Sequence, residues 1–494
     1  MTSSRRRPAS TGGARKRGPR GPRVDRARRT AMAALTEVRE NDAYANLALP
    51  LLLRSEGLSG RDAAFTTELV YGTLRGRGLL DAVLTRCSSR PLDAVDPEVL
   101  DVLRLGAHQL LEMRVPAHAA VDETVALTRS TPGTRAAAGF VNAVLRKVGG
   151  DDVAGWTARV APDPEVDPIG HLAVAHSHPA WIVRAFAEAL AGEAATDTSI
   201  EVGPSTVSGP LAVGSPRYAE LADLLEADNA PPAVALAVRP GLAGVDELVS
   251  AGAAPGRWSP FGAVLSGGDP GDIPAVAQGR AGVQDEGSQL VAAALALAPL
   301  DGRDERWLDL CAGPGGKAAL LTGLANGAGA RLVAVESNAR RAHLVQRAVR
   351  AYPEPPEVTV GDGRDVGDAE PGGYDRVLVD APCTGLGSLR RRPESRWRRQ
   401  PADIGALAPL QRALLASAVA AVRPGGLVGY VVCSPHVAET DGPVGDAVRT
   451  GGAELVDARP VLPGVEPLGP GPTVQLWPHR HGTDAMFLAL LRRR

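Results

Sequence analysis

Strand-like and helix-like segments alternate through the C-terminal half of the chain, and this pattern limits the fold more than any other feature. From about residue 281 onward, short apolar runs are separated by longer runs with helical periodicity. The expected strands lie at 307–311, 332–336, 358–360, 376–380 and 427–433, and the expected helices at 317–324, 339–351 and 407–422. Such alternation predicts a parallel, doubly wound α/β sheet. Ligands of these sheets bind beyond the carboxyl ends of the strands, so the residues that end each strand are the candidates for chemistry.

The chain begins with a strongly basic segment. Residues 1–29 contain eleven Arg and Lys residues against one acid, Asp25, with Gly, Pro and Ser between them. We therefore expect a disordered basic tail over residues 1–25. No apolar run follows the arginines, as a secretory signal would require. The tail either binds nucleic acid loosely, in a salt-dependent manner, or is a solvated tail without a specific partner.

The remainder is expected to be multidomain. The expected division is an all-α helical bundle at 26–150, a linker or insertion at 151–215, a small α+β module at 216–280 and an α/β Rossmann-like domain at 281–494. Within the linker we expect one short helix near 179–190. Within the α+β module we expect a helix at 218–227 and a strand at 233–238.

Composition excludes two broad classes of protein. The longest clean apolar run, 290–300, is roughly half of the ~20 residues that a membrane span needs, so we expect no membrane partner. Four cysteines in 494 residues favour free thiols over a disulfide scaffold, as in a cytoplasmic protein. The net charge of −2 hides any nucleic-acid signal, so charge has to be read locally.

The first three expected strands end in a glycine-rich turn and two acids. The turn contains Cys311, Ala312, Gly313, Pro314, Gly315, Gly316 and Lys317. It lacks the spacing of a phosphate-binding loop, and tight packing is the alternative explanation. Glu336 could accept hydrogen bonds from a ribose, or be a solvated strand end, and Asp362 could receive an adenine amino group. A turn followed by two acids, with no pyrophosphate site, fits S-adenosyl-L-methionine better than NAD.

The fourth and fifth expected strands each lead to a cysteine. Asp380 and Cys383 follow one strand, and Cys433 and His436 follow the other. A catalytic disulfide lacks the usual C-x-x-C pairing, and a metal site would have at most three ligands at an unfamiliar spacing. Nucleophilic catalysis, with one thiolate attacking and the other assisting, is the third reading. Two buried structural cysteines are the fourth.

An arginine-rich segment follows Cys383. Residues 388–399 contain six arginines and one tryptophan. Arginine interleaved with an aromatic ring suits phosphates and a stacked base, whereas a solvated amphipathic segment is the alternative. The candidate RNA-binding residues are Arg390, Arg391, Arg392, Arg396, Trp397 and Arg398.

These motifs together resemble a known family. The stretches 311–317, 380–385 and 433–436, with 283–289 and 481–487, resemble Sun/Fmu-type 16S rRNA (cytosine-5)-methyltransferases. The helical region resembles their fused NusB-like domain at 61–72, 115–121 and 139–146. The resemblance covers about 26–190 and 215–494, with the motifs in the family's order.

The resemblance implies a function and a role for each matching residue. Residues 311–317, Glu336, Asp362 and Asp380 would bind S-adenosyl-L-methionine, and Lys317 and Asp380 would also belong to the catalytic group. Cys433 would attack carbon-6 of a cytosine, and Cys383 would assist release. The implied partner is 16S rRNA or a small-subunit precursor, with a monomeric chain and no metal. The alternatives are a tRNA methyltransferase and a non-catalytic RNA-binding assembly factor.

Overall fold

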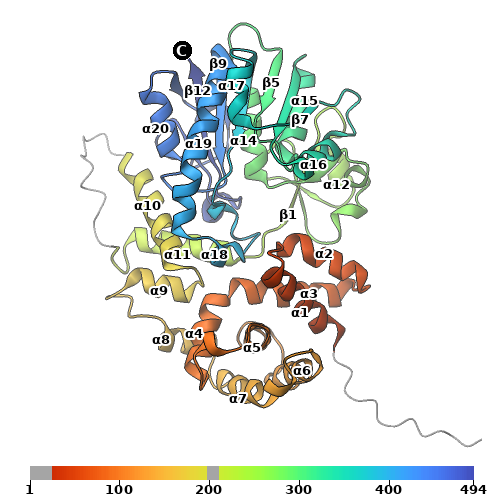
Figure 1. Cartoon of the computed structure of the whole chain (residues 1–494), viewed down its shortest axis with the longest axis vertical. Coiled ribbons are helices and arrows are strands. Elements are labelled where there is room, and N and C mark those ends of the chain that lie inside the picture. The colour runs from red at the N-terminus through yellow and green to blue at the C-terminus, as the bar shows by residue number, and fades with distance from the viewer. Residues whose placement is uncertain (1–24, 197–210) are drawn as a thin grey trace, which may run out of the picture.

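The computed structural model describes residues 25–196 and 211–494 (Figure 1). The predicted basic tail therefore lies outside the described residues, except for Asp25. The Asp25 side chain accepts a hydrogen bond from Ala27 N and caps the first helix.

The N-terminal domain is all helical, as predicted. It comprises α1 (Arg26–Glu40), α2 (Ala45–Ser55), α3 (Gly60–Arg75), α4 (Arg77–Cys87), α5 (Pro97–Leu111), α6 (Ala117–Ser130) and α7 (Ala138–Val148). Their apolar faces meet in one buried core that includes Leu69, Leu84 and Leu103. These helices form the lower part of the molecule in Figure 1.

Residues 151–229 contain more helix than predicted. They form α8 (Val153–Val160), α9 (Pro168–Ala175), α10 (Ala180–Thr196) and α11 (Pro216–Asn229), of which the last two match the helices expected near 179–190 and 218–227. The two that were not predicted, α8 and α9, have N-termini capped by Asp152 and Asp167. The helix α11 belongs to this helical layer and not to the α+β module, because it packs against α10 and α21 (Pro478–His481).

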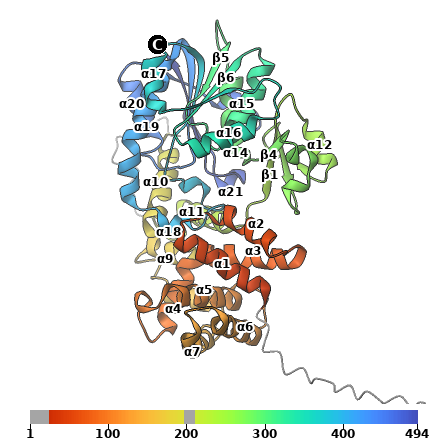
Figure 2. The ribbon, with the colours of Figure 1, turned by 45° about the vertical axis from the view of Figure 1, so that its right-hand side comes forward.

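A small α+β module follows, as predicted. Its antiparallel sheet has the order β2-β3-β1-β4, and its two helices are α12 (Val245–Ser250) and α13 (Pro274–Ala277). The strands are β1 (Val234–Val238), β2 (Ala254–Pro255), β3 (Gly262–Leu265) and β4 (Ala281–Val283). Because β4 pairs with β1, the module extends to Val283. Figure 2 shows it to one side of the larger sheet.

The C-terminal domain is built on a sheet of order β10-β12-β9-β8-β5-β6-β7. The five predicted strands are β5 (Arg306–Asp309), β6 (Arg331–Glu336), β7 (Glu357–Val360), β8 (Tyr374–Asp380) and β9 (Val422–Val432), all parallel to their neighbours among these five. The other strands are β10 (Ala453–Val456), β11 (Val474–Gln475) and β12 (Phe487–Arg493). Because β12 pairs antiparallel with β9, the sheet is mixed and not purely parallel. The strand order reverses at β5, which places a ligand crevice beyond the ends of β5 and β8.

Helices cover both faces of this sheet. They are α14 (Glu286–Leu297), α15 (Gly316–Gly327), α16 (Ala339–Val349), α17 (Val366–Ala369), α19 (Pro401–Ala421) and α20 (Asp441–Arg449). The short helix α18 (Ser395–Arg398) lies instead toward the helical domain. In the described part of the chain, α19 alone is long and apolar enough to cross a membrane by length and composition. It packs against β8 and β9, and its Leu414, Leu415 and Ala418 are buried in the core.

Candidate active site

The glycine-rich turn at the end of β5 is held tightly against the end of β6. Gly313 N donates a hydrogen bond of 3.1 Å to Glu336 Oε2. A Cβ at position 313 would lie 2.4 Å from the same oxygen, so only glycine fits there. Gly315 has φ +109° and starts α15 from the left-handed region. The turn therefore brings the backbone close to Glu336, as a nucleoside-binding turn requires.

The two predicted cofactor acids are already hydrogen-bonded. Glu336 is buried and accepts hydrogen bonds from Asn338 N at 2.8 Å and Arg341 Nη2 at 2.7 Å. Asp362 lies on the next strand end, where hydrogen bonds from Arg364 lower its pKa to about 2. Both carboxylates lie on one rim, and ligand hydroxyl or amino groups have to share them with these arginines.

An ion pair lies at the centre of the crevice. Lys317 Nζ is 2.8 Å from Asp380 Oδ2, and both side chains are largely buried. Burial disfavours the charged ammonium, but the contact with Asp380 outweighs it and raises the pKa of Lys317. The sequence prediction placed Lys317 and Asp380 on different strand ends, and the structure brings them together.

Both candidate thiols open into the same crevice. Because β8 pairs with β9, Cys383 and Cys433 follow neighbouring strands, and their Sγ atoms are 3.4 Å apart. The hydrogen bond from the Cys383 thiol lowers the pKa of Cys433, with a further contribution from the charge of Lys317. The same hydrogen bond, together with burial, raises the pKa of Cys383. Of the two thiols, Cys433 is therefore the one more readily ionised.

The third cysteine at the strand ends differs from these two. Burial raises the pKa of the Cys311 thiol, and nearby carboxylates, including Asp309 and Asp380, raise it further. Among the described residues, no group of three or more His, Cys, Asp or Glu side chains could hold a metal ion. The chemistry of the crevice therefore centres on Cys433, Cys383, Lys317 and Asp380.

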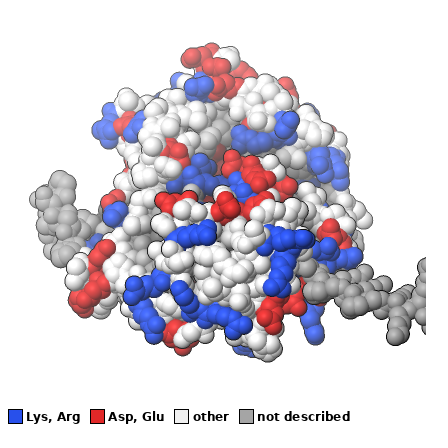
Figure 3. All heavy atoms as spheres, turned by 60° about the horizontal axis from the view of Figure 1, so that its bottom comes forward, with Lys and Arg blue, Asp and Glu red and all other residues white. Residues whose placement is uncertain are grey.

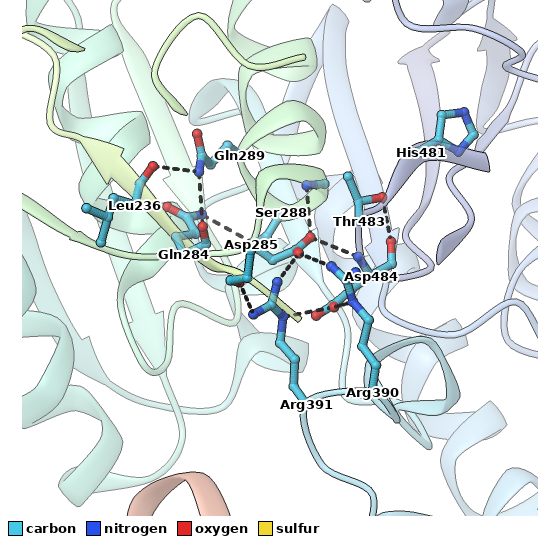
Figure 4. Close-up of polar contacts among 12 residues, drawn as sticks. Leu236, Gln284, Asp285, Ser288, Gln289, Arg390, Arg391, His481, Thr483 and Asp484 are labelled. Carbon is cyan, nitrogen blue, oxygen red and sulfur yellow. Dashed lines mark hydrogen bonds and ion pairs between the residues drawn. The ribbon is translucent and has the colours of Figure 1, made fainter. Parts of the chain in front are cut away.

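A buried network of two arginines and two aspartates supports the loop after Cys383 (Figure 4). Arg390 contacts Asp484 at 2.8 Å and Asp285 at 2.9 Å, and Arg391 contacts Asp285 at 2.5 Å and Asp484 at 2.9 Å. In the same loop, Gly387 N donates a hydrogen bond of 2.9 Å to Cys433 O. The network therefore holds the loop after Cys383 in place, and this loop is hydrogen-bonded to the backbone of Cys433. The sequence analysis assigned no role to Asp285 or Asp484, although both lie in motifs that carried the family resemblance.

Most members of the arginine segment make contacts within the protein, and their interpretation as RNA-binding residues is wrong for the fully buried Arg396. Arg390 and Arg391 are held by the aspartate network. The fully buried Arg396 donates to Arg75 O, Ser177 O, Asp228 O and Asn229 Oδ1. Arg398 donates to Val38 O and Ala43 O of the helical domain. The guanidinium groups of these arginines are bonded to other residues of the protein. A phosphate cannot reach the fully buried Arg396.

The remaining two members also contact the helical domain. The Arg392 guanidinium lies over the Tyr44 ring, and the Arg77 guanidinium lies over the Trp397 ring. The segment therefore joins the helical and catalytic domains. Figure 3 shows Lys and Arg side chains spread over the face where the helical domain comes forward, with acidic side chains between them, and no single basic patch.

Comparison with known proteins adds to this geometry. A family model described as 16S rRNA methyltransferase RsmB/F matches residues 294–492, and one described as NusB family matches residues 25–149. A Mycobacterium tuberculosis protein is named as a methyltransferase, with no substrate in its name. It is 54% identical to this chain, over 97% of this chain and 99% of its own length. The ribosomal RNA small subunit methyltransferase B of Pseudomonas putida is 32% identical, over 87% of this chain and 91% of its own. The crystal structure named PH0851 has the same fold, with a TM-score of 0.72 at 22% identity over 94% of this chain and 97% of that one.

Proposed function

We propose, from the premise that this chain belongs to the 16S rRNA methyltransferase RsmB/F family, that it methylates carbon-5 of a cytosine in 16S rRNA. The membership makes it an S-adenosyl-L-methionine-dependent RNA methyltransferase. The observation that carries the finer proposal is the thiol pair of Cys433 and Cys383, 3.4 Å apart beside Lys317 and Asp380. A pure RNA-binding factor needs no such pair.

The rim of the crevice fits the methyl donor. The backbone of the turn from Cys311 to Lys317 would bind its methionine part, Glu336 its ribose and Asp362 its adenine. Because Gly313 has no Cβ, the backbone of the turn can lie close to Glu336, where the ribose would bind. When bound, S-adenosyl-L-methionine supplies an electrophilic methyl group for carbon-5 of the base.

Cys433 would supply the nucleophile that cytosine lacks. Carbon-5 of cytosine is itself a weak nucleophile, but addition of the Cys433 thiolate to carbon-6 converts the ring into an enamine. After carbon-5 is methylated, its proton passes to a base beside the ring and the bond between carbon-6 and Sγ breaks. The electrons of that bond return to Cys433, which leaves as a thiolate. Cys383, in contact with Cys433, would assist this release.

Asp380 and Lys317 would orient the base. The Asp380 carboxylate can accept a hydrogen bond from the cytosine amino group, which is a donor at its edge. Lys317 fixes that carboxylate through the 2.8 Å contact and adds positive charge beside Cys433. Both residues therefore act on the ring and on the thiolate at the same time.

The substrate would be an unstacked or single-stranded cytosine, because an enzyme that reacts with a base has to reach it outside the stack. We propose 16S rRNA or a small-subunit precursor in the cytoplasm, with a monomeric chain and no metal. The NusB-like domain supports rRNA over tRNA as the substrate.

Incubation with unmodified 16S rRNA and methyl-labelled S-adenosyl-L-methionine, followed by digestion to nucleosides, tests the proposal. We expect the label in 5-methylcytidine. Label in any other nucleoside would contradict the carbon-5 chemistry. Label that appears only with tRNA would contradict the choice of substrate and leave the chemistry intact.

Replacing Glu336 by glutamine is expected to weaken binding of S-adenosyl-L-methionine by about 10- to 100-fold, because a charged acceptor of the ribose hydroxyls is lost. Calorimetry on the free protein measures this directly. Glu354→Gln is the matched control, since the exposed Glu354 pairs only with Arg331 on the surface of the same domain. Equal affinities of the Glu336→Gln and Glu354→Gln variants would remove Glu336 from the cofactor site.

A further inference from the structure

Glu439 is a buried carboxylate that contacts the residue after Cys383. In the chain it lies between Cys433 and α20, and it has no exposed surface. Its Oε1 accepts hydrogen bonds from Thr384 N at 2.8 Å and Gln411 Nε2 at 3.1 Å, and its Oε2 accepts one from Thr384 Oγ1 at 2.5 Å. Three hydrogen bonds from two residues, Thr384 and Gln411, therefore fix the position of the carboxylate.

The hydrogen bonds of Glu439 connect the two cysteine loops. Thr384 is the residue after Cys383, and Ser434 is the residue after Cys433. Thr384 Oγ1 lies 3.4 Å from Ser434 Oγ, and both hydroxyls are buried. The backbone of Glu439 is itself fixed by the Tyr430 hydroxyl, which donates to Glu439 O at 2.8 Å.

The charge of Glu439 is not balanced by a cation. Across residues 25–196 and 211–494, no Lys, Arg or His forms a salt bridge with it, and the neighbouring Arg412 pairs with Asp446. Lys317, by contrast, carries its positive charge on the side of Cys433. Cys383 therefore faces the carboxylate of Glu439, whereas Cys433 faces Lys317 together with the carboxylates of Asp380 and Asp484.

We propose that Glu439 is a positioning residue that keeps the shared proton on Cys383, so that the negative charge of the thiol pair rests on Cys433. This inference rests on the proposed role of Cys433 as the nucleophile. A carboxylate behind Cys383 makes a thiolate there unfavourable, while the Cys383 thiol remains free to donate its hydrogen bond to Cys433.

The charged groups around the pair support this assignment. Cys383 faces Glu439 and the Tyr430 hydroxyl, and the Glu439 charge adds to the hydrogen bond and burial that raise the Cys383 pKa. Cys433 faces Lys317, Asp380 and Asp484, of which the two carboxylates oppose the effect of Lys317 on its pKa. Which of the two sulfurs carries the shared proton therefore depends on Glu439 and not on Lys317 alone.

Two substitutions separate the charge of Glu439 from its hydrogen bonds. Glu439→Gln removes the charge, but its amide oxygen can accept from Thr384 N and its amide nitrogen can donate to Thr384 Oγ1. Glu439→Asp keeps the charge and shortens the side chain by one methylene. The readout is alkylation by iodoacetamide at pH 6–9, measured for Cys383 and Cys433 separately by peptide mass spectrometry on the full chain without RNA. Cys383 and Cys433 are both partly exposed residues, whereas Cys87, outside this site, is buried.

In Glu439→Gln we expect the alkylation rate of Cys383 relative to Cys433 to rise about tenfold at pH 7, which corresponds to about one pKa unit. In Glu439→Asp we expect the wild-type ratio. An unchanged ratio in Glu439→Gln, or an equal change in both variants, would overturn the proposal. The wild-type chain gives a test without any variant, because alkylation of Cys383 as fast as Cys433 would also overturn it. Since this assay uses no RNA, its failure is distinct from a failure of the proposed methylation, which the labelled-nucleoside experiment detects.

Discussion

Replacing Cys433 by alanine is expected to lower methyl transfer to 16S rRNA by on the order of 10³-fold or more, because no other group can activate carbon-5. Binding of S-adenosyl-L-methionine should stay within about twofold of wild type, since the rim residues are intact. The assay is incorporation of labelled methyl groups at saturating RNA, with calorimetry for the cofactor.

The chain offers a matched control for this substitution. Cys87 is a buried cysteine that lies in α4 within the core of the helical domain. Cys87→Ala should retain methyl transfer, whereas Cys383→Ala should accumulate a covalent protein–RNA adduct. Normal turnover by Cys433→Ala would refute the role of Cys433 as nucleophile.

Replacing Arg396 by methionine is expected to loosen the helical domain from the catalytic domain. The buried guanidinium joins Arg75 of α3, Ser177 before α10 and Asn229 of α11 to α18. Methionine keeps much of the volume but leaves these acceptors without a donor, at a cost of about 1–3 kcal/mol for each buried group. We expect the thermal midpoint to fall by about 2–4 °C or more. Hydrogen exchange should accelerate around residues 75–79 and 177–182, which lie at this junction.

The effect on activity should separate RNA handling from cofactor binding. Arg396 contacts none of the residues proposed to bind S-adenosyl-L-methionine, so the affinity for this cofactor should be unchanged. Methylation of RNA should fall, because the two domains no longer hold one relative position. Arg399→Met is the control, since Arg399 is partly exposed and has only a weak contact of 4.0 Å with Asp403. Unchanged exchange at the junction in Arg396→Met would contradict this role.

Much of the fold and site could be predicted because the predictions rested on local patterns. The five parallel strands appear as short apolar runs, and Asp380, Cys383 and Cys433 directly follow two of them. Their meeting in one crevice depends on β8 and β9 being neighbours, which the register confirms. The antiparallel strand β12 was missed because pairing between distant segments leaves no mark in the spacing of either one.

The errors came where burial decides the role of a polar residue. Composition cannot separate an arginine on the surface from Arg396, which is bonded to four protein acceptors in the interior. In the same way, a lone acid six residues after Cys433 gives no motif, so Glu439 became visible only through its contacts. The helices α8 and α9 were missed because their Asp caps and prolines also occur in loops.

The most direct test of the account is the position of the covalent bond between protein and RNA. The Cys383→Ala chain would be incubated with 16S rRNA and S-adenosyl-L-methionine, digested with nuclease and protease, and examined by mass spectrometry. We predict a cytidine nucleotide attached to the peptide that contains Cys433. Attachment to any other residue, or continued formation of 5-methylcytidine by Cys433→Ala, would contradict the mechanism.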